Sequence, residues 1–263
     1  MQSDVATYGI KLFDAYAELL EQARHSQGVG LVHRWRVRTK RLKALLAFLA
    51  WQADSRRSAP PWKKFRKTFK WAGALRDLQV QARLLGAHRD AFPEAVKLLL
   101  KSQAPIRKHA RQELRRALDN FPAEDLQLPR KDLQLELEQL LAASPREHAL
   151  AYCRAQLQAA DPLTGAGDAE QLHLIRIRLK KALYLVDLFG LAGEFPGKRL
   201  KAIDRLQKRL GQWHDRQVLY EYLQPFAPFH PQIEQLSKRI RNELNRRRKE
   251  IVRELKNWTD TAA

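Results

Sequence analysis

The sequence predicts an all-α protein built from two four-helix repeats. Three observations indicate this fold class. Apolar residues recur every three or four positions along most of the 263-residue chain, as in Leu42, Leu45 and Leu49. No alternating run of β-branched residues bounded by turns indicates a sheet. Blocks of sequence from the first half reappear, in the same order, in the second half.

Helix-start signals set the expected boundaries. Ser144 and Glu147 form a capping box ahead of an apolar pattern. Asp168 stands three residues before Gln171 and is predicted to cap the next helix. Pro105 lies inside a helical pattern, which it is expected to kink or break. The expected helices span residues 4–25, 29–53, 61–86, 93–119, 130–142, 146–160, 169–190, 196–223 and 231–258.

The internal repeat divides the chain. It predicts a first four-helix repeat over residues 1–122, an acidic connector over 123–144 and a second four-helix repeat over 145–263. The first pair of blocks carries His, Arg, Arg and Lys at the same offsets. The paired blocks are Leu31–Arg41 with Gln171–Lys181, Gly73–Val80 with Gly211–Val218, and Lys108–Leu114 with Lys238–Leu244.

The first repeated helix has one basic face. With about 100° per residue, His33, Arg36, Lys40 and Lys43 fall within an arc of roughly 80°. The apolar residues of the same helix lie on the opposite side. Arginine offers a planar fork of donors to phosphate oxygens, and lysine offers a mobile point charge. We therefore expect this face to bind a polyanion.

The second copy repeats the pattern with His173, Arg176 and Lys180. It departs at Leu183, which stands where Lys43 would be. A basic face needed only for solubility would require positive charge but not the same residue types at the same positions. The repeated residues therefore favour a functional interpretation over a solvated basic face. Further candidate ligands of the polyanion are Arg41, Lys181, Lys108, Arg111, Lys238 and Arg241.

Four more residues are expected to support the site. Arg38 and Arg178 fall within the apolar sector of their helices, where Asp77 and Asp215 are candidate partners. These two carboxylates could equally aim basic residues at the ligand or cap a helix locally.

Glycines and tryptophans inside the helical patterns are expected to be structural. Gly73 and Gly211 should allow close approach of two helices, since glycine costs about 1 kcal/mol within a helix. Trp35, Trp71 and Trp213 lie in apolar patterns and are expected in the core rather than as stacking platforms.

Composition favours a basic, cytoplasmic protein. The 49 Lys and Arg residues against 29 Asp and Glu residues give a formal charge of +20, which attracts polyanions without specifying which. The single cysteine, Cys153, is expected to be buried, and no disulfide, metal site or cofactor is predicted. No apolar run is long enough for a membrane span, and the N-terminus lacks a signal-peptide pattern.

The paired blocks resemble the conserved histidine α-helical domain (CHAD) family over nearly the whole chain. Ala182 and Leu183 depart from the family pattern. The residues that carry the resemblance are Val32-His33, Arg36-Val37 and Lys40-Arg41-Leu42-Lys43 in the first half, and Leu172-His173, Arg176-Ile177, Lys180-Lys181, Tyr184 and Leu206–Asp215 in the second.

The resemblance implies two four-helix bundles related by a pseudo-two-fold axis, with a basic groove or pore that binds inorganic polyphosphate. It implies a non-catalytic protein that is targeted to, or organises, polyphosphate granules in the cytoplasm. Polyphosphate-metabolising enzymes are then candidate partners, and nucleic acid would bind only non-specifically.

Two alternatives remain open on the sequence. A nucleic-acid binder would suit the net charge, although no helix-turn-helix, zinc-finger or RNP-type motif stands out. A polyphosphate-processing enzyme would commonly need carboxylates that hold divalent metals, and the acidic residues here are scattered. A phosphoenzyme on His33 or His173 is not excluded by the sequence.

Overall fold

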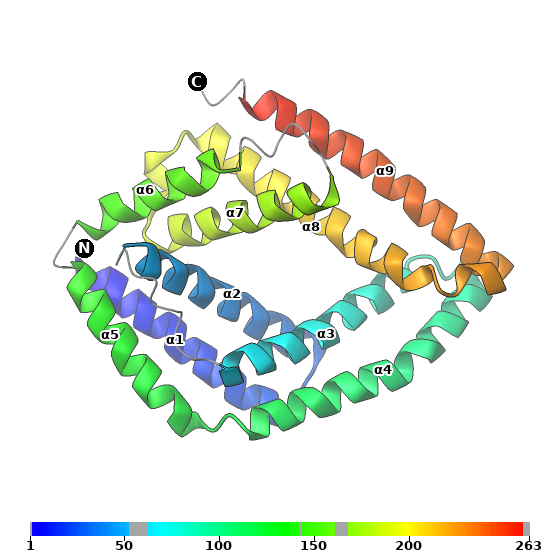
Figure 1. Cartoon of the computed structure of the whole chain (residues 1–263), viewed down its shortest axis with the longest axis horizontal. Coiled ribbons are helices and arrows are strands. Elements are labelled where there is room, and N and C mark those ends of the chain that lie inside the picture. The colour runs from blue at the N-terminus through cyan, green and yellow to red at the C-terminus, as the bar shows by residue number, and fades with distance from the viewer. Residues whose placement is uncertain (1, 53–62, 142–143, 161–167, 260–263) are drawn as a thin grey trace. The chain divides into compact units, whose positions relative to one another are not determined.

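The fold is all-α. A computed structural model describes residues 2–52, 63–141, 144–160 and 168–259, and within these ranges it contains helices and no strand. None of the described helices is long and apolar enough to cross a membrane. The helices are α1 (Gln2–His25), α2 (Val29–Gln52), α3 (Lys63–Gly86), α4 (Pro93–Asp119), η1 (Ala123–Leu126), α5 (Gln127–Leu141), α6 (Pro145–Gln158), α7 (Ala169–Leu188), η3 (Leu191–Glu194), α8 (Gly197–Leu223), η4 (Ala227–Phe229) and α9 (Pro231–Thr259) (Figure 1).

One predicted helix cap is confirmed. Asp168 accepts a hydrogen bond on Oδ1 from the backbone N–H of Gln171 at 2.8 Å, so it caps α7 as predicted. Proline is the first residue of α4, α6 and α9, where a missing N–H costs nothing. The predicted break at Pro105 does not occur, because α4 continues through it as one helix.

The chain divides into two compact units. Unit 1 comprises Met1–Arg76, Ala110–Gln156 and Lys181–Phe195, and unit 2 comprises Asp77–His109, Leu157–Lys180 and Pro196–Ala263. Helices α3, α4, α6 and α7 each contribute residues to both units. The predicted division into two sequence repeats stays a prediction.

The core of unit 1 is aromatic. Helices α1 and α2 pack side by side after the short turn at 26–28 (Figure 1). Tyr16 of α1 stacks on Trp35 of α2, with ring centroids 6.3 Å apart, and both side chains are buried. Phe48 of α2 meets Phe189, which follows α7, at 5.2 Å. Trp35 is thus a core residue, as its position in the apolar pattern predicts.

The predicted connector is part of unit 1. Helix α5 packs against α1, with Leu133 and Leu137 buried. Arg130 of α5 donates from Nε to Oδ1 of Asp14 in α1 at 2.7 Å. A helix is expected over residues 130–142, and α5 is that helix, with its apolar side against α1.

The core of unit 2 is a seam between α8 and α9, which lie side by side (Figure 1). Leu206, Leu210 and Trp213 of α8 are buried, as are Ile240 and Leu244 of α9. Leu172, Ile175 and Leu179 of α7 are also buried at spacings of three and four, and this places the opposite face of α7 toward the surface.

Candidate functional site

The predicted basic face of α2 lies away from the core. His33 and Lys43 are exposed, and Arg36 and Lys40 are half-buried. Trp35 and Leu42 on the other side of the helix are buried. The helical wheel therefore predicts correctly which side of α2 presents its basic residues.

Arg36 is held in a fixed position by α3. Its Nη1 donates a hydrogen bond to the backbone carbonyl of Phe69 at 3.2 Å. Its guanidinium carbon lies 4.7 Å from the centroid of the Phe69 ring, within the range of a cation–π contact. The backbone carbonyl and the ring of Phe69 therefore orient the Arg36 guanidinium, and neither of these groups carries a negative charge.

Lys43 lies against the same ring as Arg36. Its Nζ is 5.0 Å from the Phe69 centroid. Desolvation beside this ring lowers the pKa of the Lys43 ammonium, and the neighbouring charges of Lys181 and Arg36 lower it further. We call Arg36, Lys43, Phe69 and Lys181 the α2 cluster, and all four residues belong to unit 1.

Gly73 makes room for Arg36 rather than for a neighbouring backbone. A Cβ atom at Gly73 would lie 2.8 Å from Nη1 of Arg36, closer than side chains pack. At Gly211 the matching neighbour is Nε of Arg176, 3.8 Å from a Cβ atom, which is an ordinary contact. The predicted close helix–helix approach is thus wrong at Gly73, because a guanidinium fills the space.

A second basic cluster joins α7 and α8 in unit 2. The rings of His173 and His214 lie 5.3 Å apart between centroids. Burial lowers the pKa of His214 to about 4, and the charges of Arg176 and His173 contribute, against the opposing carboxylates of Asp215 and Glu221. Burial also lowers the pKa of His173, helped by Arg176. We call His173, Arg176 and His214 the α7–α8 cluster.

Lys40, Lys180 and Lys181 have different settings. Lys40 and Lys180 are half-buried on α2 and α7. Lys181 is half-buried as well, but it belongs to unit 1 and acts on Lys43, whereas Lys180 belongs to unit 2. In the sequence, Lys181 belongs to the same repeated block as His173 and Arg176. In the structure, its charge acts on Lys43 of α2.

Arg41, a predicted ligand, is paired with a carboxylate. Its Nη1 lies 3.0 Å from Oδ2 of Asp187 and 3.3 Å from the hydroxyl of Tyr8, to which it donates. Its guanidinium also lies 5.8 Å from the ring centroid of Tyr184. These contacts join α1, α2 and α7 within unit 1, and the predicted role of Arg41 in binding stays a prediction.

The predicted ligands on α4 lie at the surface. Lys108 and Arg111 are both exposed. Arg111 lines a cleft of about 400 Å³ in unit 1, together with His25 and Arg115. Arg24 of the same cleft donates to the backbone carbonyls of Leu118 and Phe121, so it fixes the end of α4.

Lys238 and Arg241 are exposed on α9. The ammonium of Lys238 is paired with Oε1 of Glu234 at 2.6 Å. The predicted role of Lys238 and Arg241 in polyphosphate binding stays a prediction.

The supporting residues are only partly placed. Arg38 and Arg178 are half-buried, Asp77 is exposed and Asp215 is half-buried. Asp215 acts on His214, whose pKa it raises against the neighbouring cations. The predicted pairing of the two arginines with the two carboxylates stays a prediction.

Sequence reasoning missed two residues of the clusters. His214 was within reach, because both copies of the Gly73–Val80 block place a basic residue, Arg76 or His214, directly before the aspartate. Phe69 gave no such signal, because the corresponding position in the second repeat is Gln207.

Two further predictions concern chemistry. Cys153 is buried, and burial raises the pKa of its thiol to about 12, so it is an inert core residue as predicted. Among the described residues, no group of three or more His, Cys, Asp or Glu side chains could hold a metal ion.

The chain is similar to known CHAD domains. The CHAD domain family model matches residues 10–224 and 148–263. A solved structure, the CHAD domain from the plant Ricinus communis, superposes with a TM-score of 0.71 at 20% sequence identity, over 95% of this chain and 91% of that one. A comparison with curated proteins finds no match.

Proposed function

Because the chain belongs to the CHAD family, we propose that it binds inorganic polyphosphate without catalysing a reaction, through the α2 cluster and the α7–α8 cluster. Each cluster brings basic side chains of one helix into contact with a neighbouring helix. The ligand is a linear chain of phosphates, so it offers charge and oxygen acceptors but no bases.

The observation that carries this proposal is the gathering of basic side chains in both clusters. Desolvation is the largest cause of the lowered pKa of Lys43 in unit 1, and the charges of Lys181 and Arg36 lower it further. In unit 2, desolvation is the largest cause of the lowered pKa of His173 and His214, and the charge of Arg176 adds to it. An anion that enters either cluster opposes these charges and favours the protonated forms.

The geometry of Arg36 suits phosphate. Its guanidinium is oriented by a carbonyl and a ring from α3. Pre-orientation lowers the conformational entropy lost on binding, and a guanidinium binds phosphate oxygens through parallel donors. Arg176 of the second cluster lies beside the matching glycine, Gly211. In both repeats, therefore, an arginine of the basic helix face lies beside a glycine within a helix.

Nucleic acid is the main competing ligand, since the chain carries a formal charge of +20. The α2 cluster favours polyphosphate, because the aromatic side chain in it already packs against two cations. Arg36 and Lys43 lie 4.7 and 5.0 Å from the Phe69 centroid. A ring engaged in this way is not a platform on which a base could stack.

A polyphosphate-binding protein without enzymatic activity would serve to place itself, or other proteins, on condensed phosphate. We therefore propose association with polyphosphate granules and contact with enzymes that make or degrade polyphosphate. Fluorescent tagging of the chain in cells with and without polyphosphate tests this localisation.

Calorimetric titration at about 150 mM salt tests the binding itself. The ligands are long-chain polyphosphate, triphosphate, and single- and double-stranded DNA at equal charge concentration. Long polyphosphate should bind at least about tenfold more tightly than DNA, a difference of roughly 1.4 kcal/mol. Equal affinity for DNA and polyphosphate would contradict the proposal, and so would release of phosphate or formation of new ATP when Mg²⁺ and ADP are present.

A further inference from the structure

Helix α9 has chemically different sides. With Ile240 placed at 0° and about 100° per residue, Leu244, Ile251 and Leu255 fall between roughly 20° and 60°. All four side chains are buried. This sector is the apolar seam of α9.

A carboxylate flank adjoins the seam. Glu243, Glu250 and Glu254 fall between roughly 280° and 320° on the same wheel. Glu243 is paired with Arg216 of α8 at 3.1 Å, and Glu254 with Arg205 and Arg209 of α8, each at 3.0 Å. These ion pairs join the carboxylate flank of α9 to α8.

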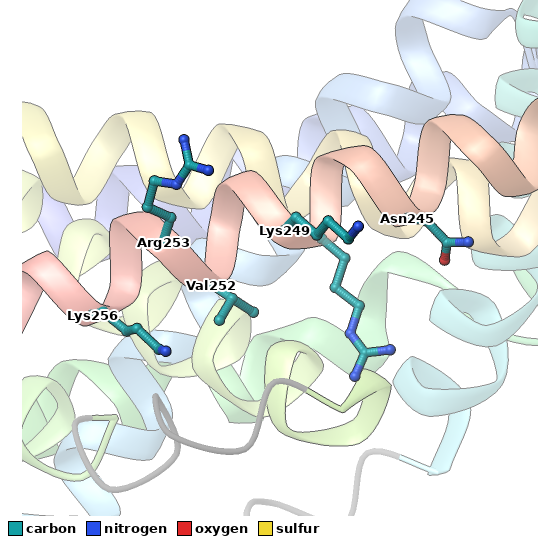
Figure 2. Close-up of a pocket in the computed structure, with 6 residues that line it drawn as sticks. Asn245, Lys249, Val252, Arg253 and Lys256 are labelled. Carbon is teal, nitrogen blue, oxygen red and sulfur yellow. The ribbon is translucent and has the colours of Figure 1, made fainter.

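The side opposite the seam is basic and hollowed. A surface cavity of about 480 Å³ is lined, among the described residues, by Asn245, Arg248, Lys249, Val252, Arg253 and Lys256. These positions fall between roughly 80° and 220° on the wheel. Figure 2 shows Val252 and Lys256 projecting from one side of the helix and Arg253 from the other side of the ribbon.

The described lining of this cavity contains basic side chains and no Asp or Glu. Within the described part of the chain, neither Lys249 nor Arg253 takes part in an ion pair, whereas the α9 carboxylates Glu243 and Glu254 do. The described lining residues include no aromatic side chain, so they offer no surface on which a nucleic-acid base could stack.

The basic side of α9 is long. Lys238 and Arg241 fall at roughly 160° and 100°, on the same side as the cavity. Because Lys238 is paired with Glu234, the usable stretch begins near Arg241 and reaches Lys256. This stretch is about 22 Å long at 1.5 Å per residue, so it spans several consecutive charges of a linear polyanion.

We infer that this side of α9 is a separate contact site for linear condensed phosphate, centred on Lys249, Arg253 and Lys256. The inference rests on the proposed function, because it takes polyphosphate as the ligand of the chain. It adds a surface outside the α2 and α7–α8 clusters, and one that only a chain of several phosphates can occupy along its length.

The test compares two triple variants of the whole protein with equal charge. The first is Lys249→Gln/Arg253→Gln/Lys256→Gln, at three exposed cavity residues. The matched control is Lys97→Gln/Lys101→Gln/Lys201→Gln, at three exposed lysines of α4 and α8 in the same unit. Circular dichroism checks that both variants keep the helix content of the wild type.

Titration with long-chain polyphosphate should give a dissociation constant about tenfold higher for the cavity variant, and within about twofold of wild type for the control. The slope of log affinity against log salt should fall by roughly 2, because three cations are removed at about 0.7 counterions each. Triphosphate should bind both variants alike. In the wild type, long polyphosphate should protect Lys249 and Lys256 from an amine-reactive label, and should leave Lys97 and Lys101 labelled.

The outcomes separate the two proposals. If wild-type protein does not bind polyphosphate, the proposed function fails, and this site with it. If wild type binds and the cavity variant matches the control, with no protection of Lys249 and Lys256, only the α9 inference fails. If the cavity variant loses DNA binding alone, the surface serves nucleic acid and the inference is overturned.

Discussion

The guanidinium of Arg36 occupies the space that a side chain at Gly73 would fill. A Cβ atom at position 73 would lie 2.8 Å from Nη1 of Arg36. Arg36 on the basic face of α2 and Gly73 within α3 both belong to repeated blocks of the sequence. Together they set the position of the Arg36 guanidinium.

Substitution of Gly73 should separate binding from stability. In Gly73→Ala, the methyl group must push the Arg36 guanidinium away from Phe69, and we expect polyphosphate affinity to fall by about threefold to tenfold, or roughly 0.7–1.4 kcal/mol. The matched control is Gly211→Ala, where the new atom would make an ordinary 3.8 Å contact. That variant should keep its affinity within about twofold and unfold at a higher temperature, since alanine stabilises a helix over glycine by about 0.5–1 kcal/mol. Equal losses of affinity in both variants would show that Gly73 has no special relation to Arg36.

The ring of Phe69 should matter for both cations that lie against it. Phe69→Leu keeps the backbone carbonyl but removes the ring that contacts Arg36 and Lys43. Each cation–π contact contributes about 0.5–1 kcal/mol, so we expect polyphosphate affinity to fall roughly threefold to tenfold. Phe229→Leu is the control, because Phe229 is 85% exposed and lies outside both clusters. An unchanged affinity in Phe69→Leu would remove the ring from the site.

Acid should destabilise the fold through its histidines. The pKa values of His88, His173 and His214 lie below the ordinary value of 6.5, chiefly because of burial. Below pH 6.5 the unfolded chain takes up protons that the folded chain resists, so stability is complete above that pH and falls as the pH drops toward about 4.

Thermal unfolding at pH 7 and pH 5 measures this effect. The unfolding temperature should fall with pH in the wild type, and the fall should be smaller in His214→Gln by about 2–4 °C. That difference corresponds to about 1 kcal/mol in a chain of this size, a discounted figure for a partly exposed group. The same fall in both proteins would mean that His214 is not the titrating group.

Polyphosphate binding should take up protons. The pKa values of His173 and His214 are lowered partly by Arg176, and a bound anion opposes that charge and raises both values. Affinity should therefore increase as the pH falls from 7.5 to 5.5, and less so in His173→Gln/His214→Gln. Binding heats in two buffers of different ionisation enthalpy count the protons directly, and zero uptake by the wild type would refute the linkage.

The helices could be predicted from the sequence because their signals are local. The cap at Asp168 and the apolar spacing in α2 and α7 act within a few residues of the chain. Pro105 does not end α4, which continues through it despite the missing N–H, so the predicted break is wrong and the predicted kink stays a prediction.

The candidate site could be predicted only in part, because a helical wheel does not say what lies opposite each face. The repeat places Arg36 and Arg176 on the basic faces of their helices, but the contact of Phe69 with Arg36 depends on how α3 packs on α2. Arg41 is paired with Asp187, which is far along the chain, and no spacing rule links the two. Lys181 likewise acts on Lys43 through the packing of α7 in unit 1.

The most direct measurement of the central claim is a polyphosphate titration of Arg36→Glu/Arg176→Glu. The matched control is Arg34→Glu/Arg89→Glu, which reverses two exposed charges outside both clusters. We predict that the first variant keeps its helix content by circular dichroism and loses measurable binding, while the control binds with a modest, salt-sensitive loss. Wild-type affinity in the folded Arg36→Glu/Arg176→Glu protein would contradict the account and place the binding site elsewhere.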